Sequence, residues 1–157
     1  MACAIVTVSD TRTPETDGSG RRIREMLEAA GHTVVGYDLV PDDPARVRAT
    51  VEARLRAAEA ECIVTSGGTG IAPRDTTYEA LAGLMDKRLD GFGELFRMLS
   101  FAEIGSAAML SRAVAGVAAG RILIVLPGST AAVELALTRL VLPELRHMVG
   151  LVRGAAA

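Results

Sequence analysis

Short apolar runs that alternate with amphipathic segments constrain the fold of this chain more than any other feature. Apolar runs rich in β-branched residues predict a buried strand at residues 2–9 and further strands at residues 33–40, 62–65 and 121–126. Apolar residues spaced three and four positions apart predict helices around residues 23–30, 47–58, 92–99 and 133–140. Strands that are apolar on both faces belong in a sheet covered on both sides. The pattern therefore predicts an α/β domain with three layers, α/β/α, around a mostly parallel sheet.

Local signals place the start of two helices and leave one segment open. Asp43 followed by Pro44 has the form of an N-cap and a first helical residue. Thr76 with Glu79 three residues later has the form of a capping box. Residues 106–120 are rich in alanine and are compatible with helix, strand or loop.

Length and charge restrict the class of protein. The 157 residues fit one domain, taken as residues 1–157. The 17 basic and 19 acidic residues leave a net charge of −2, and the chain has only three Phe and two Tyr. A positive field and stacking platforms for nucleic acid are therefore not expected. No apolar run is long enough to span a bilayer, and no basic leader precedes the first one. We expect a cytoplasmic protein with no nucleic-acid or membrane partner.

The cysteines and histidines show no pattern of a metal site or of a catalytic nucleophile. Cys3 and Cys62 lie in separate apolar runs and form no zinc motif, so we expect buried thiols in a reducing compartment. His32 and His147 have no neighbouring ligand or triad pattern, which favours surface or packing roles.

Three loops that follow predicted strands are the candidate ligand site. Each of the three contains glycine together with serine or threonine: residues 10–20, 66–75 and 127–130. Loops that follow parallel strands would meet at the carboxyl edge of the sheet. The central loop has neither the P-loop lysine nor the third glycine of a dinucleotide motif. A single loop of this kind could equally be a tight turn or a ligand-binding loop. Three of them on one edge of the sheet favour binding of an anion, above all phosphate. The glycine loop contributes Ser66, Gly67, Gly68, Thr69 and Gly70.

Two aspartates near these loops have no clear structural task. Thr76 can cap the helix in place of Asp75, and Asp43 can do so in place of Asp42. A carboxylate beside a phosphate site is unfavourable unless it binds Mg²⁺ or handles a proton. Each of Arg12 and Arg74, taken alone, is expected to be a solvated surface residue.

Several motifs together resemble the MogA/MoaB family of molybdenum-cofactor biosynthesis proteins, and lean toward its MoaB side. They are TSGGTGIAPRDTTYEA at 65–80, GFGELFRMLS at 91–100, EIGS at 103–106, MLSRA at 109–113, LPGS at 126–129, VTVSD at 6–10 and DGSGR at 17–21. They span nearly the whole chain. The glycine loop also occurs in wider relatives, whereas the segment at 91–97 is more specific to this family.

The resemblance implies a fold like that of molybdopterin-binding domains and a specific reaction. Active members transfer AMP from Mg-ATP to the terminal phosphate of molybdopterin and release pyrophosphate. The family's functional aspartates match Asp42 and Asp75, with Asp75 also the metal ligand, and we expect both to place Mg²⁺ or orient the attacking phosphate. The matching ligand-binding residues are Ser9, Asp10, the glycine loop 66–70, Glu94, Pro127, Gly128 and Ser129. Glu94 either contacts the pterin or fixes its own helix.

The resemblance also implies partners and leaves alternatives. Members assemble as trimers or hexamers, and other proteins of the pathway are possible partners. The apolar residues Phe92, Phe96 and Phe101 are either core or subunit interface. Some MoaB-type members have no clear transfer activity, so a binding protein without turnover is the alternative. A nucleotide pyrophosphatase of the competence-damage type is less favoured, because it usually brings a second domain.

Overall fold

The computed structural model describes residues 1–57 and 59–154, so Ala58 of the predicted helical stripe lies outside the described residues. Six strands form one sheet: β1 (Ala2–Val8), β2 (Thr33–Val40), β3 (Cys62–Ser66), β4 (Lys87–Arg88), β5 (Val114–Ala118) and β6 (Arg121–Leu126). The helical elements are α1 (Gly18–Ala29), α2 (Pro44–Ala57), α3 (Thr77–Ala82), α4 (Asp90–Ile104), the 3₁₀ helix η1 (Gly105–Leu110), α5 (Thr130–Ala136), the π-helical turn η2 (Leu137–Val141) and α6 (Leu142–Val152).

The sheet is mostly parallel, as the apolar strands predict. Its strand order is β2-β1-β3-β6-β5-β4. The first four strands run parallel, whereas β5 is antiparallel to both β6 and β4. Loops that follow the four parallel strands therefore leave the sheet at one edge. Because Val114 pairs with Val125 near the end of β6, the segment that enters β5 reaches the same edge.

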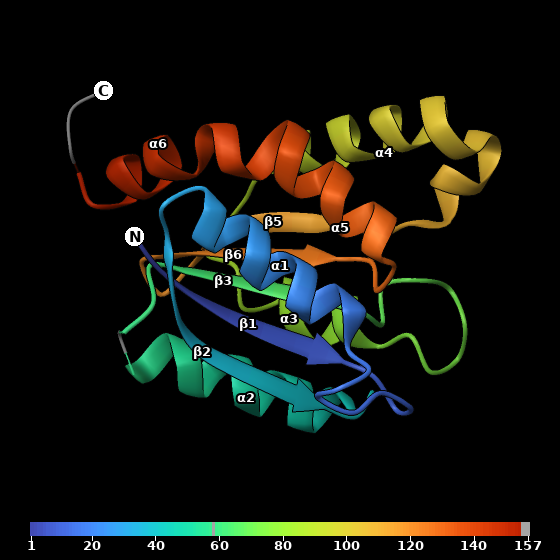
Figure 1. The fold of residues 1–157 in the computed structure, drawn as a ribbon, viewed down its shortest axis with the longest axis horizontal. Helices are drawn as coiled ribbons and strands as arrows, with labels where there is room; N and C mark the ends of the chain where they lie inside the picture. The colour runs from blue at the N-terminus through green and yellow to red at the C-terminus, as the bar shows by residue number, and fades with distance from the viewer. Residues whose placement is uncertain (58, 155–157) are drawn as a thin grey trace.

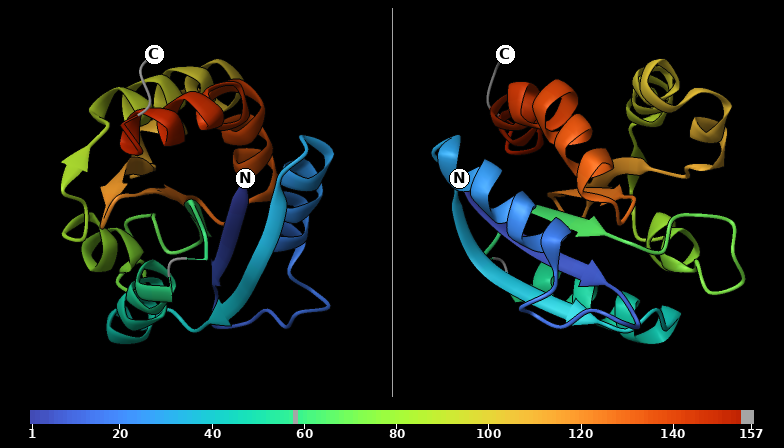
Figure 2. Two further views of the ribbon diagram at one scale, coloured as in Figure 1. Left: turned by 90° about the vertical axis from the view of Figure 1, so that its left-hand side faces the viewer. Right: turned by 45° about the vertical axis from the view of Figure 1, so that its right-hand side comes forward.

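Helices cover both faces of the sheet and complete the predicted three layers. α1, α4, α5 and α6 lie on one face, and α2 and α3 lie on the other (Figure 1). Two further views show the same division (Figure 2). Ile23 and Phe96 are buried in the first core, and Val47, Val51 and Leu81 are buried in the second. Within the described parts of the chain, no helix is both long and apolar enough to cross a bilayer.

The segment 106–120, left open by the sequence, contains two different elements. Its first part belongs to η1, and its second part is β5, which forms a hairpin with β6. Ala119 and Gly120 make the two-residue turn, with φ of 48° and 72°. Positive φ at both positions is the requirement of the type I′ turn that joins twisted strands. Alanine is rare in that conformation, which explains why the sequence did not show a hairpin.

Both predicted helix starts are confirmed, but only one of them has the predicted side-chain cap. Asp43 caps α2, since its Oδ1 accepts a hydrogen bond of 2.8 Å from the amide of Arg46. Thr76 precedes α3 but makes no capping bond with its side chain. Its hydroxyl instead donates to Oδ1 of Asp42 at 3.1 Å. A long-range carboxylate has therefore replaced the local partner that a capping box would supply.

Gly67, which directly follows β3, tests how tightly the strand ends pack. Its φ is 110°, and a Cβ there would lie 2.1 Å from the carbonyl oxygen of Val8. We expect Gly67→Ala to lower the free energy of unfolding by at least about 2 kcal/mol, because both the backbone and the contact would be strained. Urea unfolding followed by circular dichroism measures this.

Gly83 offers the matched control. It has open space around its Cβ position and a φ of −73°. Gly83→Ala should change the free energy of unfolding by no more than about 1 kcal/mol, in the stabilising direction. Equal stability of the two variants would show that the close approach at Gly67 is not a constraint.

Candidate functional site

The three predicted loops do converge at one edge of the sheet. The amide of Gly67 donates to the carbonyl of Leu126 at 3.0 Å, which joins the glycine loop to the end of β6. A Cβ on Gly128 would lie 3.2 Å from Cα of Gly67. The close contact of Gly67 with Val8 brings in the end of β1. The glycine loop therefore lies between the loops that follow β1 and β6.

A network of hydrogen bonds between polar side chains connects these loops. Arg12 donates through Nη2 to the carbonyl of Gly128 at 2.9 Å and through Nη1 to Oγ of Ser19 at 2.5 Å. Ser19 in turn lies 3.1 Å from Ser66, hydroxyl to hydroxyl. Arg12 also pairs with Asp17 at 3.3 Å. The expectation that Arg12 is only a solvated surface residue is therefore wrong, because its guanidinium joins the first and third loops directly and reaches Ser66 through Ser19.

Asp17 is an important residue that the sequence reasoning missed. Its carboxylate is buried and accepts hydrogen bonds from the amide of Gly20 at 3.0 Å and the hydroxyl of Tyr37 at 2.8 Å. Burial alone would raise the pKa of Asp17, but hydrogen bonds to the charged form outweigh it and lower the pKa. Burial, together with Asp17, raises the pKa of Tyr37 to about 12. Asp17 thus stays ionised and holds Arg12. Its position just before a glycine-rich helix start was the available signal.

Three aspartates surround the glycine loop. Asp42 is buried, and its carboxylate faces Gly68, where a Cβ would lie 2.8 Å from Oδ2. Asp75 faces Gly70 in the same way, and a Cβ on that glycine would lie 2.6 Å from Oδ2 of Asp75. Asp10 accepts a hydrogen bond of 3.0 Å from the amide of Asp42. Glycine at these positions leaves room for the carboxylates to lie against the loop.

The electrostatics of the three aspartates differ. Burial raises the pKa of Asp42, and the neighbouring carboxylates of Asp10 and Asp75 raise it further. Arg74 pairs with Asp10 at 2.7 Å and lowers the pKa of that exposed carboxyl. Arg74 itself is largely exposed, in agreement with the surface role expected for it. The charge of Asp42 is therefore less well compensated than that of Asp10.

The donor set suits a shared Mg²⁺ site better than a closed metal cage. Within residues 1–57 and 59–154, no group of three or more His, Cys, Asp or Glu residues is arranged to hold a metal by itself. Mg²⁺ is usually bound by one or two carboxylates together with water and substrate phosphates. Asp42 and Asp75 offer hard oxygens on either side of a loop rich in backbone amides. The buried charge of Asp42 would be favoured by a cation, so these residues fit Mg²⁺.

Ser9 and Ser129 use their side chains to shape the loops. Oγ of Ser9 accepts hydrogen bonds from the amides of Thr11 at 3.3 Å and Arg12 at 3.2 Å. Ser129 is the N-cap of α5 and accepts a bond of 3.2 Å from the amide of Ala132. Both lie at the loop edge, as predicted, and Pro127 precedes Gly128 in the same turn.

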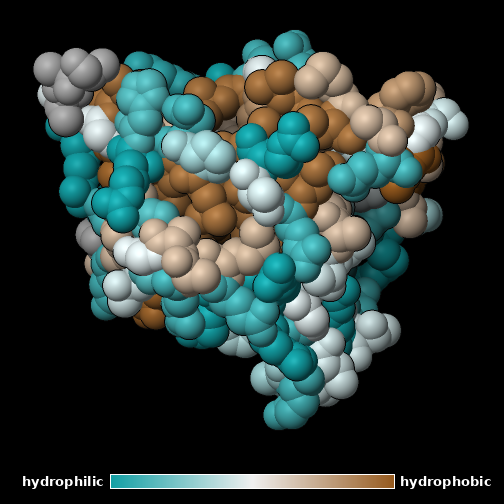
Figure 3. All heavy atoms as spheres, turned by 45° about the horizontal axis from the view of Figure 1, so that its top comes forward, coloured by the Kyte–Doolittle hydropathy of each residue, from teal (hydrophilic) through white to brown (hydrophobic). Residues whose placement is uncertain are grey.

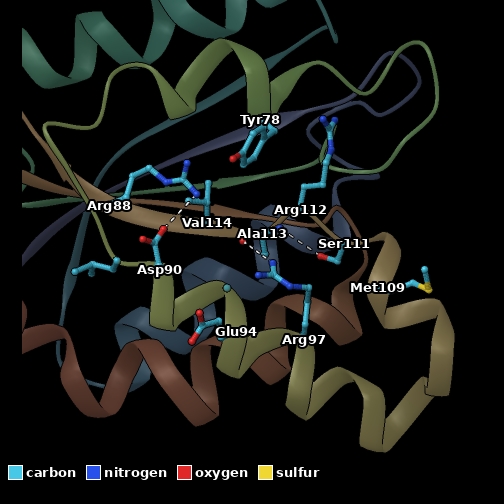
Figure 4. Close-up of a pocket in the computed structure, with 12 residues that line it drawn as sticks. Tyr78, Arg88, Asp90, Glu94, Arg97, Met109, Ser111, Arg112, Ala113 and Val114 are labelled. Carbon is cyan, nitrogen blue, oxygen red and sulfur yellow. Dashed lines mark hydrogen bonds and ion pairs between the residues drawn. The ribbon is translucent and has the colours of Figure 1, made fainter.

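Glu94 is the one predicted residue that the structure separates from the loops. It lies on α4 and lines a pocket of about 550 Å³ beside the loop cluster (Figure 4). The pocket lies between α3, the first turns of α4 and the segment that enters β5. Its wall carries three guanidinium groups and two carboxylates. The lining residues are Tyr78, Arg88, Leu89, Asp90, Gly93, Glu94, Arg97, Met109, Ser111, Arg112, Ala113 and Val114.

Comparison with known proteins identifies the family. Residues 4–147 match the family model MoCF_biosynth, described as "Probable molybdopterin binding domain". The chain belongs to this family. The match runs from within β1 to within α6 and includes every loop of the site.

Similar proteins agree with this membership and with the MoaB side of the family. Molybdenum cofactor biosynthesis protein B of Halalkalibacterium halodurans is 52% identical over 149 residues, which cover 94% of this chain and 88% of that protein. A crystal structure of a molybdenum cofactor biosynthesis protein B is 47% identical, with a TM-score of 0.95 over 98% of this chain and 96% of that one. The tungsten cofactor synthesizing protein MoaB of Pyrococcus furiosus is 36% identical, with a TM-score of 0.88 over 97% and 96%.

The raised pKa of Asp42 predicts a pH-dependent stability. Because the folded state favours the protonated carboxyl, the contribution of Asp42 to stability is present at low pH and is lost as pH rises above its ordinary pKa of 3.8 and through the raised value. Asp42→Asn removes the buried charge and keeps an oxygen that can accept from Thr76. We expect the variant to be more stable than the parent at pH 7 by up to about 1 kcal/mol.

Urea unfolding at pH 4 and pH 7 measures this difference. The gap between variant and parent should shrink at pH 4, because the raised pKa makes the parent carboxyl more protonated there than at pH 7. A variant that is less stable than the parent at pH 7 would contradict the assignment of an uncompensated charge to Asp42.

Proposed function

We propose that this protein acts in molybdenum cofactor biosynthesis, where it binds molybdopterin and transfers AMP from Mg-ATP to its terminal phosphate. The observation that carries the proposal is the glycine loop, flanked by Asp42 and Asp75 and adjoining a 550 Å³ pocket, in a member of this family. The relatives' names support the pathway. The transfer step is what the family resemblance implies, and the site geometry supports it.

The glycine loop and the turn at Pro127–Ser129 supply the phosphate contacts in this proposal. Positive φ at Gly67 and Gly68 turns successive amides of the loop in directions that other residues rarely allow. An oxygen of the molybdopterin phosphate attacks the α-phosphorus of ATP, and the bond to the pyrophosphate oxygen breaks. The substrate thus provides the nucleophile, and the protein contributes positioning and charge stabilisation.

Asp75 and Asp42 would hold Mg²⁺ in the proposed site. When bound, the ion neutralises charge on the ATP phosphates. Asp75 is the more accessible ligand, since it is half-buried, whereas Asp42 is buried and held by Thr76. Asp10, fixed by Arg74, keeps the backbone of Asp42 in place through the amide hydrogen bond.

The pocket is the proposed place of the pterin. A pterin presents an amino group and a ring N–H on one edge, which a carboxylate can accept, and Glu94 is an exposed carboxylate in the wall. Arg88, Arg97 and Arg112 suit the anionic substituents of molybdopterin. Glu94 therefore acts in pterin binding rather than beside the phosphates.

Asp75→Asn tests the transfer step. We expect pyrophosphate release from molybdopterin and Mg-ATP to fall at least about 100-fold, while molybdopterin still binds, because the amide removes a charge needed only at the metal and phosphates. Coupled pyrophosphate detection measures turnover, and fluorescence titration measures binding. Asp43→Asn, at an exposed N-cap that asparagine also fills well, is the control and should keep normal turnover.

Two outcomes would redirect the proposal. Normal transfer by Asp75→Asn would refute the role of that residue. Tight molybdopterin binding by the parent protein without any pyrophosphate would select the alternative, a binding protein of the same pathway without turnover.

We also propose that the chain assembles as a homotrimer or homohexamer through α4. Phe96 is buried in the core, whereas Leu95, Met98, Phe101 and Ile104 form an exposed apolar row, each between 47% and 62% exposed. Apolar side chains gather on the face that carries α4, α5 and α6 (Figure 3). An exposed row of this kind typically marks an interface.

A charge placed in this row should separate the subunits. We expect Phe101→Glu to shift the protein to monomers in analytical ultracentrifugation, because a buried unpaired carboxylate is costly. Ala45→Glu, exposed on α2 on the other face of the sheet, should leave the assembly unchanged. A monomeric parent, or a Phe101→Glu variant that assembles normally, would contradict the proposed interface.

A further inference from the structure

Arg112 connects the pocket with the glycine loop. It lies in the segment that enters β5 and lines the pocket, and its side chain extends toward Tyr78 (Figure 4). Cζ of Arg112 is 5.2 Å from the centre of the Tyr78 ring, within the range of a cation–π contact. The guanidinium also pairs with Glu79 at the surface. Arg112 thus packs against Tyr78 of α3, and the exposed pair with Glu79 adds little to its placement.

The same guanidinium reaches both ends of the exposed part of the glycine loop. Nε donates to the carbonyl of Thr69 at 3.3 Å, and Nη2 donates to the carbonyl of Asp75 at 2.9 Å. The backbone amide of Arg112 also donates to Thr69, at 3.3 Å. Residues 71–74 between these carbonyls are all exposed. Arg112 therefore closes this loop at its base.

The closed loop determines where the carboxylate of Asp75 lies. Oδ2 of Asp75 accepts a hydrogen bond of 2.9 Å from the amide of Ala72, and the amide of Asp75 donates to the carbonyl of Ala72 at 2.9 Å. These two bonds are internal to the loop, so they do not attach Asp75 to the sheet, and they open readily unless the base of the loop is held closed. The bond from Arg112 supplies part of that closure.

We propose that Arg112 is a positioning residue that fixes Asp75 and the glycine loop relative to the pocket. Its planar fork donates to two carbonyls at once, whereas a lysine ammonium is a single point donor on a flexible stem. Because the same side chain forms part of the pocket wall, a ligand that packs against it favours the closed loop. The consequence for catalysis rests on the proposed function of Asp75. We call the two hydrogen bonds from Arg112 to the carbonyls of Thr69 and Asp75 the clamp, and this part of the proposal rests only on those contacts.

Amide hydrogen exchange of the parent, Arg112→Lys, Arg112→Gln and Glu79→Gln tests the clamp. We expect both Arg112 variants to speed exchange at Ala72 and Asp75 at least about tenfold, while the amides of β3 keep their protection, because only the loop loses its closure. Glu79→Gln removes the exposed ion pair but keeps both carbonyl bonds. It should leave exchange at Ala72 and Asp75 close to that of the parent.

Kinetics of pyrophosphate release supply the second readout. Arg112→Lys should lower kcat about tenfold or more while KM for Mg-ATP changes less than about threefold, as expected when a catalytic group is misplaced but its charge environment is kept. Glu79→Gln should retain the kcat of the parent.

The outcomes separate this inference from the proposed function. Unchanged exchange in Arg112→Lys would overturn the clamp, and so would an equal effect of Glu79→Gln, since charge pairing alone would then explain it. A parent protein that releases no pyrophosphate would overturn the proposed transfer, whereas the exchange data would still decide whether Arg112 holds the loop.

Discussion

The close approach of three strand ends around Gly67 is the constraint on which the site depends. Parallel pairing of β1, β3 and β6 brings their carboxyl ends to one edge, and Gly67 then passes between Val8 and Gly128 with no room for a side chain. Arg12 adds a guanidinium that reaches Gly128 and Ser19. Backbone packing and one buried polar network therefore set the geometry of three loops that are far apart in the sequence.

This packing has an electrostatic consequence. It gathers Asp10, Asp42 and Asp75 around one loop, and the buried Asp42 bears the unfavourable part of the arrangement, as its raised pKa indicates. Thr76 and Arg74 offset part of the cost by hydrogen bonding to the carboxylates. Destabilised charges of this kind are common where a protein binds a cation or a reacting group. The site is thus less favourable for folding than an apolar edge would be, which is expected of a functional region.

Much of the architecture could be predicted from local patterns. The four parallel strands are confirmed; β1, β3 and β6 are apolar runs buried on both faces, whereas β2 is a partly exposed edge strand. Asp43 is a cap because its partner lies three residues away. The Thr76 capping box was wrong because a distant carboxylate offered a competing acceptor. The β5–β6 hairpin was not predicted because its turn contains Ala119, which carries no turn signal. Glu94 was predicted to contact the pterin or to fix its own helix, and its place in the pocket beside the loops is a feature of α4 that the sequence could not show.

By itself, the sequence determined the fold class, the three glycine-bearing loops on one edge and the choice of Asp42 and Asp75 as candidates. The fold class and the loops follow from periodicity and from the rule that parallel strands end together, and the two aspartates follow from their lack of a capping role and from the family resemblance. Only the tertiary structure decided what Arg12 and Arg112 do, because their partners Gly128 and Thr69 are 116 and 43 residues away. Contacts between residues so far apart in the sequence produce no pattern of residue spacing from which they could be predicted. They exist only once the sheet has brought the loops together.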